Sequence, residues 1–203
     1  MEAEPKPVLL ESPLNYVYDY LYFVLWGGFC VYWWAMGLKV KPAERQESYG
    51  SRKLRLLMMT LGTVLLCWGG IPLPLLNLRL YPQGEWSFWT GAIVTAAGIG
   101  YAIWARRYLG SNWSRAVTVK EDHELITGGP YRLVRHPIYT GILLGLLGSA
   151  LAVAAVRGYL AVLIIGVTLW AKLRMEEQWM RQHFGEAYAE YSRHTAALVP
   201  FVL

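Results

Sequence analysis

Charged residues are scarce in this chain of 203 residues, where Asp, Glu, Lys and Arg together make up only 16%. Soluble globular proteins average about 25% charged residues and roughly 45–50% apolar residues. Here the hydrophobic share is 55% and the mean hydropathy is +0.29. This composition argues against a water-soluble enzyme. The 10 Trp and 14 Tyr residues are typical of a chain whose aromatic rings lie at membrane interfaces.

Cysteine, histidine and the common nucleotide-binding motifs are also poorly represented. The two cysteines, Cys30 and Cys67, lie in apolar runs, so we expect neither a disulfide framework nor a zinc site. The four histidines lack the spacing of metal ligands on a helix, and we predict no metal site. The sequence has no glycine-rich loop after a strand, no P-loop and no Ser/His/Asp pattern. These absences disfavour a Rossmann domain, a P-loop enzyme and a serine hydrolase.

Long apolar segments dominate what is present. A helix needs about 20 mostly apolar residues to cross the hydrocarbon core of a bilayer. The candidate segments are residues 16–38, 54–76, 86–104, 138–156 and 159–173. Only Arg157 and Gly158 separate the last two, which predicts a tight helical hairpin. A soluble helical bundle is the alternative, but its helices would carry a polar stripe that these segments lack. We therefore predict an all-α integral membrane protein with five transmembrane helices.

The basic residues fit an orientation of those five helices. Loops and tail on one side carry 16 of the 19 Lys and Arg residues, and the other side carries three. The positive-inside rule then places the N-terminus outside and the C-terminus in the cytoplasm. Because topology explains the net charge of +5, no nucleic-acid partner is expected. The length fits a single domain over residues 1–203, with two spans in 1–85 and three in 86–203.

Small residues recur every four positions in two of the apolar segments. They are Gly141, Gly145 and Ser149 in one segment, and Ala92, Ala96 and Gly100 in another. Small side chains at this spacing let two helices approach closely in lipid. We expect both faces to pack against neighbouring helices, and the oligomeric state is not predicted.

A polar loop precedes the fourth apolar segment and contains a His-Pro step. Gly128, Gly129 and Pro130 interrupt regular structure there. Pro137 fits the first turn of the following helix, where its missing N–H costs nothing. His136 would then lie beside a helix N-terminus, whose free N–H groups favour an anionic group. The alternative is that His136 only caps the helix and the nearby arginines only anchor it at the membrane surface.

The C-terminal tail begins as a polar continuation of the fifth segment. Lys172 and Glu176 are four residues apart, and Arg174 and Glu177 are three apart, so each pair shares a helix face. One interpretation is a solvated ion-pair surface. The other is that one glutamate accepts hydrogen bonds from ribose hydroxyls or from an amine of a cofactor. The residues alone leave both interpretations open.

Two stretches resemble a known family. GPYRLVRHPIYTG at residues 129–141 and EEQWMRQHFGEAYAEYSRHTAALVPF at residues 176–201 are similar to the isoprenylcysteine carboxyl methyltransferases. The wider group includes membrane phospholipid N-methyltransferases, and the resemblance covers residues 98–201. It implies an integral membrane enzyme that transfers a methyl group from S-adenosylmethionine, with S-adenosylhomocysteine as product. The acceptor would be lipid-like, either an isoprenylcysteine carboxylate or a phospholipid amine at the inner membrane surface.

The resemblance also implies which residues form the site, with the loop and the tail helix enclosing the cofactor. The implied cofactor-binding residues are His123, Glu124, Leu125, Ile126, Tyr131, His136, Pro137, Ile138, Tyr139 and Glu176. The implied catalytic residues are Lys172, Arg174 and Glu177. Lys172 stands where the carboxyl methyltransferases have an arginine that contacts the acceptor carboxylate. Lysine keeps the charge but loses the two-pronged geometry of arginine, and Arg174 is the other candidate for this contact.

The acceptor decides what Glu177 would do. A carboxylate acceptor needs only a cation to place it, whereas an amine must lose a proton, which Glu177 could accept. Two other functions stay open at this point. Membrane sterol reductases carry a similar Arg-His-Pro-x-Tyr stretch and use NADPH, and a non-catalytic membrane protein could keep the same scaffold.

Overall fold

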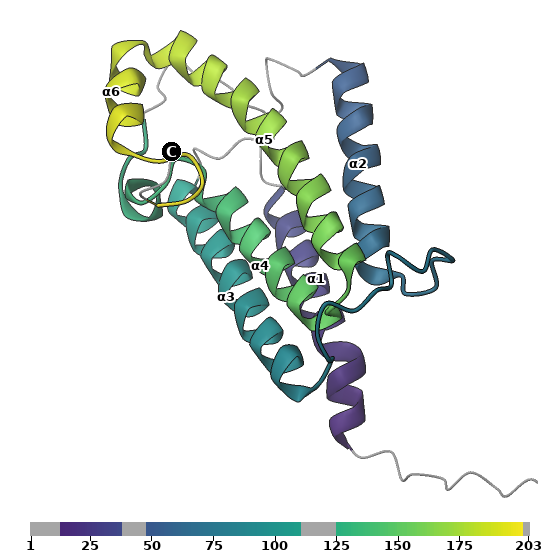
Figure 1. Cartoon of the computed structure of the whole chain (residues 1–203). Helices are drawn as coiled ribbons and strands as arrows, with labels where there is room; N and C mark the ends of the chain where they lie inside the picture. Colours follow the sequence, from purple (N-terminus) through teal and green to yellow (C-terminus); the bar gives the residue numbers. More distant parts are fainter. Residues whose placement is uncertain (1–12, 38–47, 111–124, 201–203) are drawn as a thin grey trace, which may run out of the picture.

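A computed structural model describes residues 13–37, 48–110 and 125–200 of the chain (Figure 1). Its helices are α1 (Pro13–Gly37), α2 (Tyr49–Cys67), α3 (Glu85–Leu109), the short 3-10 helix η2 (Gly129–Arg132), α4 (Pro137–Val153), α5 (Val156–Phe184) and α6 (Glu186–His194). Within the described ranges only two isolated β-bridges accompany the helices. The all-α prediction is therefore confirmed.

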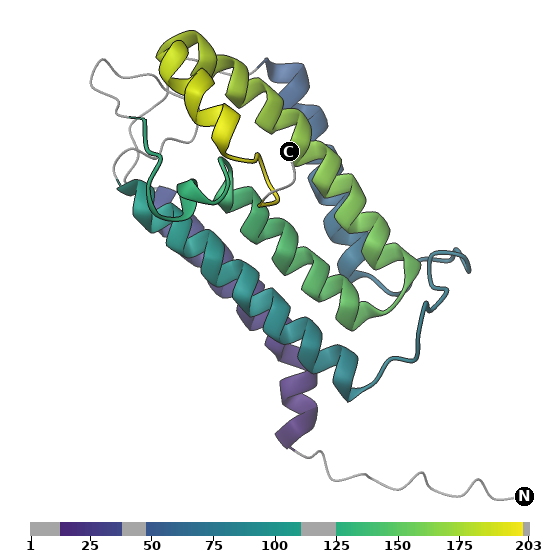
Figure 2. The same ribbon diagram turned by 60° about the vertical axis from the view of Figure 1, so that its left-hand side comes forward.

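Each of the five apolar segments contains a helix. Two of these, α3 and α5, are long and apolar enough to cross a membrane by length and composition, and α4 is a shorter apolar helix. In Figure 2, α1, α3, α4 and α5 run roughly along one another, with α2 beyond α5. The assignment of all five as transmembrane spans, and their orientation, stays a prediction.

The second helix ends earlier than its apolar segment suggests. α2 stops at Cys67, and Trp68 adopts an extended conformation while its N–H still donates to Val64 O at 2.8 Å. Residues 68–84 form a non-helical connection stabilised in part by Asn77, whose side chain donates to Ile71 O at 2.7 Å. The predicted segment 54–76 is therefore helical only to Cys67. Pro72 and Pro74, which predict a kink or an end in its last turns, lie in the non-helical part, and Gly69 and Gly70 before them also disfavour helix.

The tight hairpin between the last two long helices is confirmed, but its turn lies at Ala154 and Ala155 rather than at Arg157 and Gly158. Ala154 takes the left-handed conformation, with φ of 57°, that glycine usually provides at a helix end. Arg157 lies in the first turn of α5 and donates to Leu65 O and Leu66 O of α2. The arginine thus attaches α2 to the hairpin instead of forming the turn.

The backbones of α3 and α4 lie in direct contact. A Cβ added at Gly98 would lie 2.5 Å from Gly141 O, and one at Gly148 would lie 2.5 Å from Thr95 N. Thr95 also donates a hydrogen bond to Gly145 O at 3.1 Å. Such close approach uses backbone contacts that larger side chains would prevent.

Two of the expected small-residue positions do not face this contact. Ala96 and Gly100 are exposed on α3, and a Cβ at Gly100 would meet nothing within 4 Å. The packing face of α3 instead includes Gly91, Thr95 and Gly98. The expectation for that segment therefore holds at Ala92, which is buried, and is wrong at Ala96 and Gly100, because the small residues lie on more than one face of the helix. On α4 the expectation holds, since Gly141 packs against Ala102.

The polar continuation of the fifth segment is confirmed as a helix. α5 runs without interruption from its apolar part through both glutamates to Phe184. Gly185, with φ of 53°, then reverses the chain into α6. The residues after α6 return toward the start of α4 (Figures 1 and 2). This arrangement brings the loop before α4, the end of α5 and the C-terminal segment to one end of the bundle.

Candidate functional site

The loop before α4 is held in a defined conformation. Gly129 has φ of 58°, and a Cβ there would lie 2.5 Å from the ring of Tyr108. Pro130 and Tyr131 are buried beside it. His136 follows as the N-cap residue of α4, and Pro137 occupies the first helical turn as expected. The His-Pro step is therefore fixed at the helix N-terminus.

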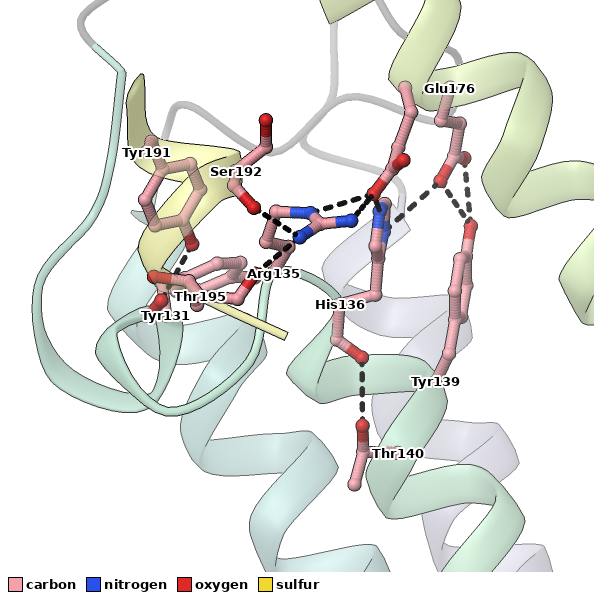
Figure 3. A network of polar contacts seen from close by, with 10 residues as sticks. Tyr131, Arg135, His136, Tyr139, Thr140, Glu176, Tyr191, Ser192 and Thr195 are labelled. Atoms are coloured by element: carbon pink, nitrogen blue, oxygen red, sulfur yellow. Dashed lines mark hydrogen bonds and ion pairs between the residues drawn. The ribbon is translucent and has the colours of Figure 1, made fainter. Parts of the chain in front are cut away.

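The two glutamates of α5 reach this step. His136 Nδ1 lies 3.8 Å from Glu176 Oε2, and His136 Nε2 lies 3.4 Å from Glu177 Oε1. Figure 3 shows the imidazole of His136 pointing from the start of α4 toward α5, with the ring of Tyr139 parallel to it. The ring centroids of His136 and Tyr139 are 5.6 Å apart with an angle of 2° between the rings. Nε2 is buried and makes no hydrogen bond of good geometry within the described part of the chain.

Arg135 binds Glu177 from the same loop. Its Nε and one terminal nitrogen each lie 2.7 Å from Glu177 Oε1. Burial raises the pKa of Glu177, but the nearby imidazole of His136 and the hydrogen-bonded, charged guanidinium of Arg135 outweigh it and lower the pKa to about 2. Glu177 is therefore ionised at neutral pH and is a weak proton acceptor.

Glu176 has a different set of neighbours. Tyr139 donates its hydroxyl to the carboxylate, with the oxygen 2.7 Å from Oε1 and 2.8 Å from Oε2. Lys172 Nζ lies 3.3 Å from Oε1 and 5.3 Å from the centroid of the Tyr139 ring. The side chain of Glu176 keeps 16% of its surface exposed, and that of Lys172 keeps 26%. Both groups can therefore be approached by a ligand.

Most of the remaining predicted residues pack rather than point outward. Ile126 contacts a buried cluster that contains Tyr131 and Ile138, and Pro137 is fully buried. Leu125 is half-buried at the start of the same described stretch. Arg174 is exposed on a different face of α5 from Lys172 and lies outside the cluster. His123 and Glu124 lie outside the described residues.

Sequence reasoning missed Arg135 and the C-terminal segment. The sequence offers a membrane-surface anchor as one interpretation of Arg135 and does not include it among the candidate site residues, yet it forms the shortest ion pair of the cluster. The segment after α6 joins the loop through a parallel bridge between Val134 and Ala196. The one available signal was the position of Arg135 directly before the His-Pro step. A basic anchor and a buried partner for a carboxylate look identical in a single sequence.

The comparisons with known proteins match the half of the chain that runs from the start of α3 into α6. The sequence model of the family described as phospholipid methyltransferase matches residues 86–187. The protein-S-isoprenylcysteine O-methyltransferases A and B of Arabidopsis thaliana are 34% and 32% identical to this chain. These alignments cover 42% and 41% of this chain and 44% and 43% of the two relatives.

A bacterial protein with a different name also matches. The cobalt-zinc-cadmium resistance protein CzcN of Cupriavidus metallidurans is 37% identical over 89 residues, which is 41% of this chain and 39% of that protein. The matched regions span less than half the length of each of these three relatives.

Proposed function

Since this chain belongs to the phospholipid methyltransferase family, we propose that it transfers a methyl group from S-adenosylmethionine to a lipid-like acceptor. The favoured acceptor is the carboxylate of an isoprenylcysteine-type substrate, reached at the inner surface of the membrane. The observation that carries the proposal is the meeting of His136 with Glu176 and Glu177, which the sequence separates by about 40 residues. The names of the two Arabidopsis relatives supply the acceptor class.

The donor set around Glu176 suits the proposed cofactor. S-Adenosylmethionine, when bound, supplies a methyl group on a positively charged sulfur and also carries ribose hydroxyls and an ammonium group. A carboxylate has about four acceptor positions. Tyr139 has one O–H and Lys172 provides one neighbouring N–H, so Glu176 retains acceptor positions for hydroxyl or ammonium donors. The buried Nε2 of His136 offers a further polar atom on the inner side of the cluster.

The other members of the cluster fix these groups. Arg135 holds Glu177 from two nitrogens, and Glu177 in turn lies against His136. Stacking on Tyr139 restricts rotation of the imidazole. A donor and an acceptor that are held in line and shielded from water react faster than the same groups in solution. The chain's contribution is therefore binding and alignment.

The state of Glu177 favours an acceptor that needs no base. A carboxylate whose pKa is about 2 is poorly suited to remove a proton from an amine at neutral pH. A carboxylate acceptor is already nucleophilic and needs a cation beside it. Lys172 has three N–H donors and directs one of them toward Glu176. The others can hold such a carboxylate near the methyl group of the cofactor.

Transfer of labelled methyl from S-adenosylmethionine tests this function. Purified protein would be incubated with the labelled donor and either an isoprenylated cysteine or phosphatidylethanolamine vesicles. Base-labile label in the isoprenylated cysteine is expected, because a methyl ester hydrolyses in base. Base-stable label in the phospholipid would instead support N-methyl transfer, the second candidate, which the description of the matched family favours. No transfer to either acceptor would contradict the proposal.

A further inference from the structure

The C-terminal part of the chain reaches the candidate site although it lies beyond the residues that the family model matches. That match ends at residue 187, whereas residues 188–200, here called the strap, contact the loop before α4. We propose that the strap is a positioning element that holds Arg135, and through it Glu177 and His136, in the arrangement that binds the methyl donor. This proposal rests on the proposed function.

The backbone of the strap is joined to the loop at consecutive residues. Arg135 N donates to Ala196 O at 2.8 Å, and His136 N donates to Ala197 O at 3.0 Å. Thr140, in the first turn of α4, donates its hydroxyl to Leu198 O at 2.6 Å. These bonds fix the two residues that face the glutamates of α5.

The strap also binds the guanidinium of Arg135. One terminal nitrogen donates to Ser192 O at 3.2 Å and to Thr195 O, on the side away from the glutamate. The remaining donors, Nε and the other terminal nitrogen, point to Glu177. Figure 3 shows Arg135 beside Ser192 and Thr195 of the strap. Because both sides of the planar group are engaged, its direction toward Glu177 depends on where the strap lies.

Two tyrosines of α6 anchor the strap itself. Tyr188 is 1% exposed, and the hydroxyl of Tyr191 donates to Tyr131 O at 2.6 Å. Tyr131 precedes Arg135 in the same loop and is buried. The strap is therefore attached to the loop on both sides of Arg135, by Tyr191 before it and by the backbone bonds after it.

Within the described ranges, the hydrogen bonds of the strap go to Arg135, to the hydroxyl of Thr140 and to the backbone of the loop, and none goes to Glu176. It would thus act through Arg135 and His136 and touch neither donor nor acceptor. Weakening it should loosen the site without removing a ligand contact. This distinguishes a positioning role from a catalytic one.

Two conservative changes test the role in the full chain. Tyr191→Phe and Thr140→Val each remove one hydroxyl that bonds across the strap–loop junction. Tyr81→Phe and Thr168→Val are matched controls, because their hydroxyls bond Leu151 O and Ile164 O away from the strap. The measurements are calorimetric titration with S-adenosylhomocysteine and, without ligand, amide hydrogen exchange of residues 134–140.

Each junction variant should bind S-adenosylhomocysteine about threefold to tenfold more weakly than wild type, as expected for loss of one hydrogen bond. It should also exchange the amides of residues 134–140 faster, while both control variants match wild type. Unchanged affinity in the junction variants, with or without faster exchange, would overturn the positioning role. If wild type itself fails to bind, the proposed function fails. In that case amide exchange alone tests whether the strap holds the loop. Equal exchange rates in all variants would show that it does not.

Discussion

Replacing Gly98 by alanine should separate the two helices that support the site. The added Cβ would lie 2.8 Å from Gly145 Cα, whereas non-bonded carbon atoms prefer about 3.5–4.0 Å. Because the obstacle is backbone, relief requires the helices to move apart by about 1 Å. A gap of that size forfeits roughly a quarter to a half of each contact's attraction. It would also stretch the hydrogen bond from Thr95 to Gly145 O, now 3.1 Å long.

Overpacking of this kind costs about 1–3 kcal/mol. The matched control is Gly100→Ala on the same helix, where a Cβ meets nothing within 4 Å. That change should be neutral or should stabilise by up to about 1 kcal/mol, since alanine favours helix more than glycine does. Thermal unfolding of both variants in detergent measures the difference. Equal melting temperatures for Gly98→Ala and Gly100→Ala would refute the close approach of α3 and α4.

Two further predictions concern the charged side chains of the site. Burial opposes ionisation of Glu177, but His136 and Arg135 outweigh it and lower its pKa from 4.5 to about 2. The ion pair should therefore stabilise the fold fully above about pH 4.5, and this stabilisation should be lost as the pH falls toward 2. Glu177→Gln should flatten the acid side of a pH titration of unfolding, and an unchanged slope would contradict the pKa. At Lys172, substitution by Gln should raise the KM for the acceptor at least about tenfold, because a cation beside a carboxylate is lost. The same change at exposed Arg174 should have the smaller effect in the methyl-transfer assay, and the reverse order would favour Arg174 as the acceptor contact.

Much of the helical framework could be predicted because long apolar runs leave the chain few alternatives. The hairpin of α4 and α5 and the polar continuation of α5 both follow from the pattern of apolar and charged residues. Boundaries were less predictable. Ala154 adopts a left-handed conformation that is uncommon for alanine. The sequence therefore predicted the hairpin turn at the nearby Gly158 instead. Gly158 lies in the first turn of α5, packed closely against α4, where an added Cβ would lie 3.2 Å from Ala150 Cα.

The candidate site was also predictable only in part from the sequence. The resemblance picked out His136 and the two glutamates, and the structure brings the imidazole of His136 within 4 Å of each carboxylate. Arg135 was missed because its partners, Glu177 and the carbonyls of Ser192 and Thr195 at the end of α6, are distant in sequence. No periodicity connects such residues. The arginine becomes part of the cluster because the folded chain brings α5 and the C-terminal segment to the start of α4.

The central claim is that the methyl donor binds where the His-Pro step meets the two glutamates. Calorimetric titration of S-adenosylhomocysteine into wild type, His136→Ala, Glu176→Ala and Glu85→Ala tests it most directly. Glu85 is an exposed carboxylate at the far end of α3 and serves as the control. The account predicts binding by wild type and Glu85→Ala and no detectable binding by the two site variants. Wild-type affinity in both His136→Ala and Glu176→Ala would contradict it.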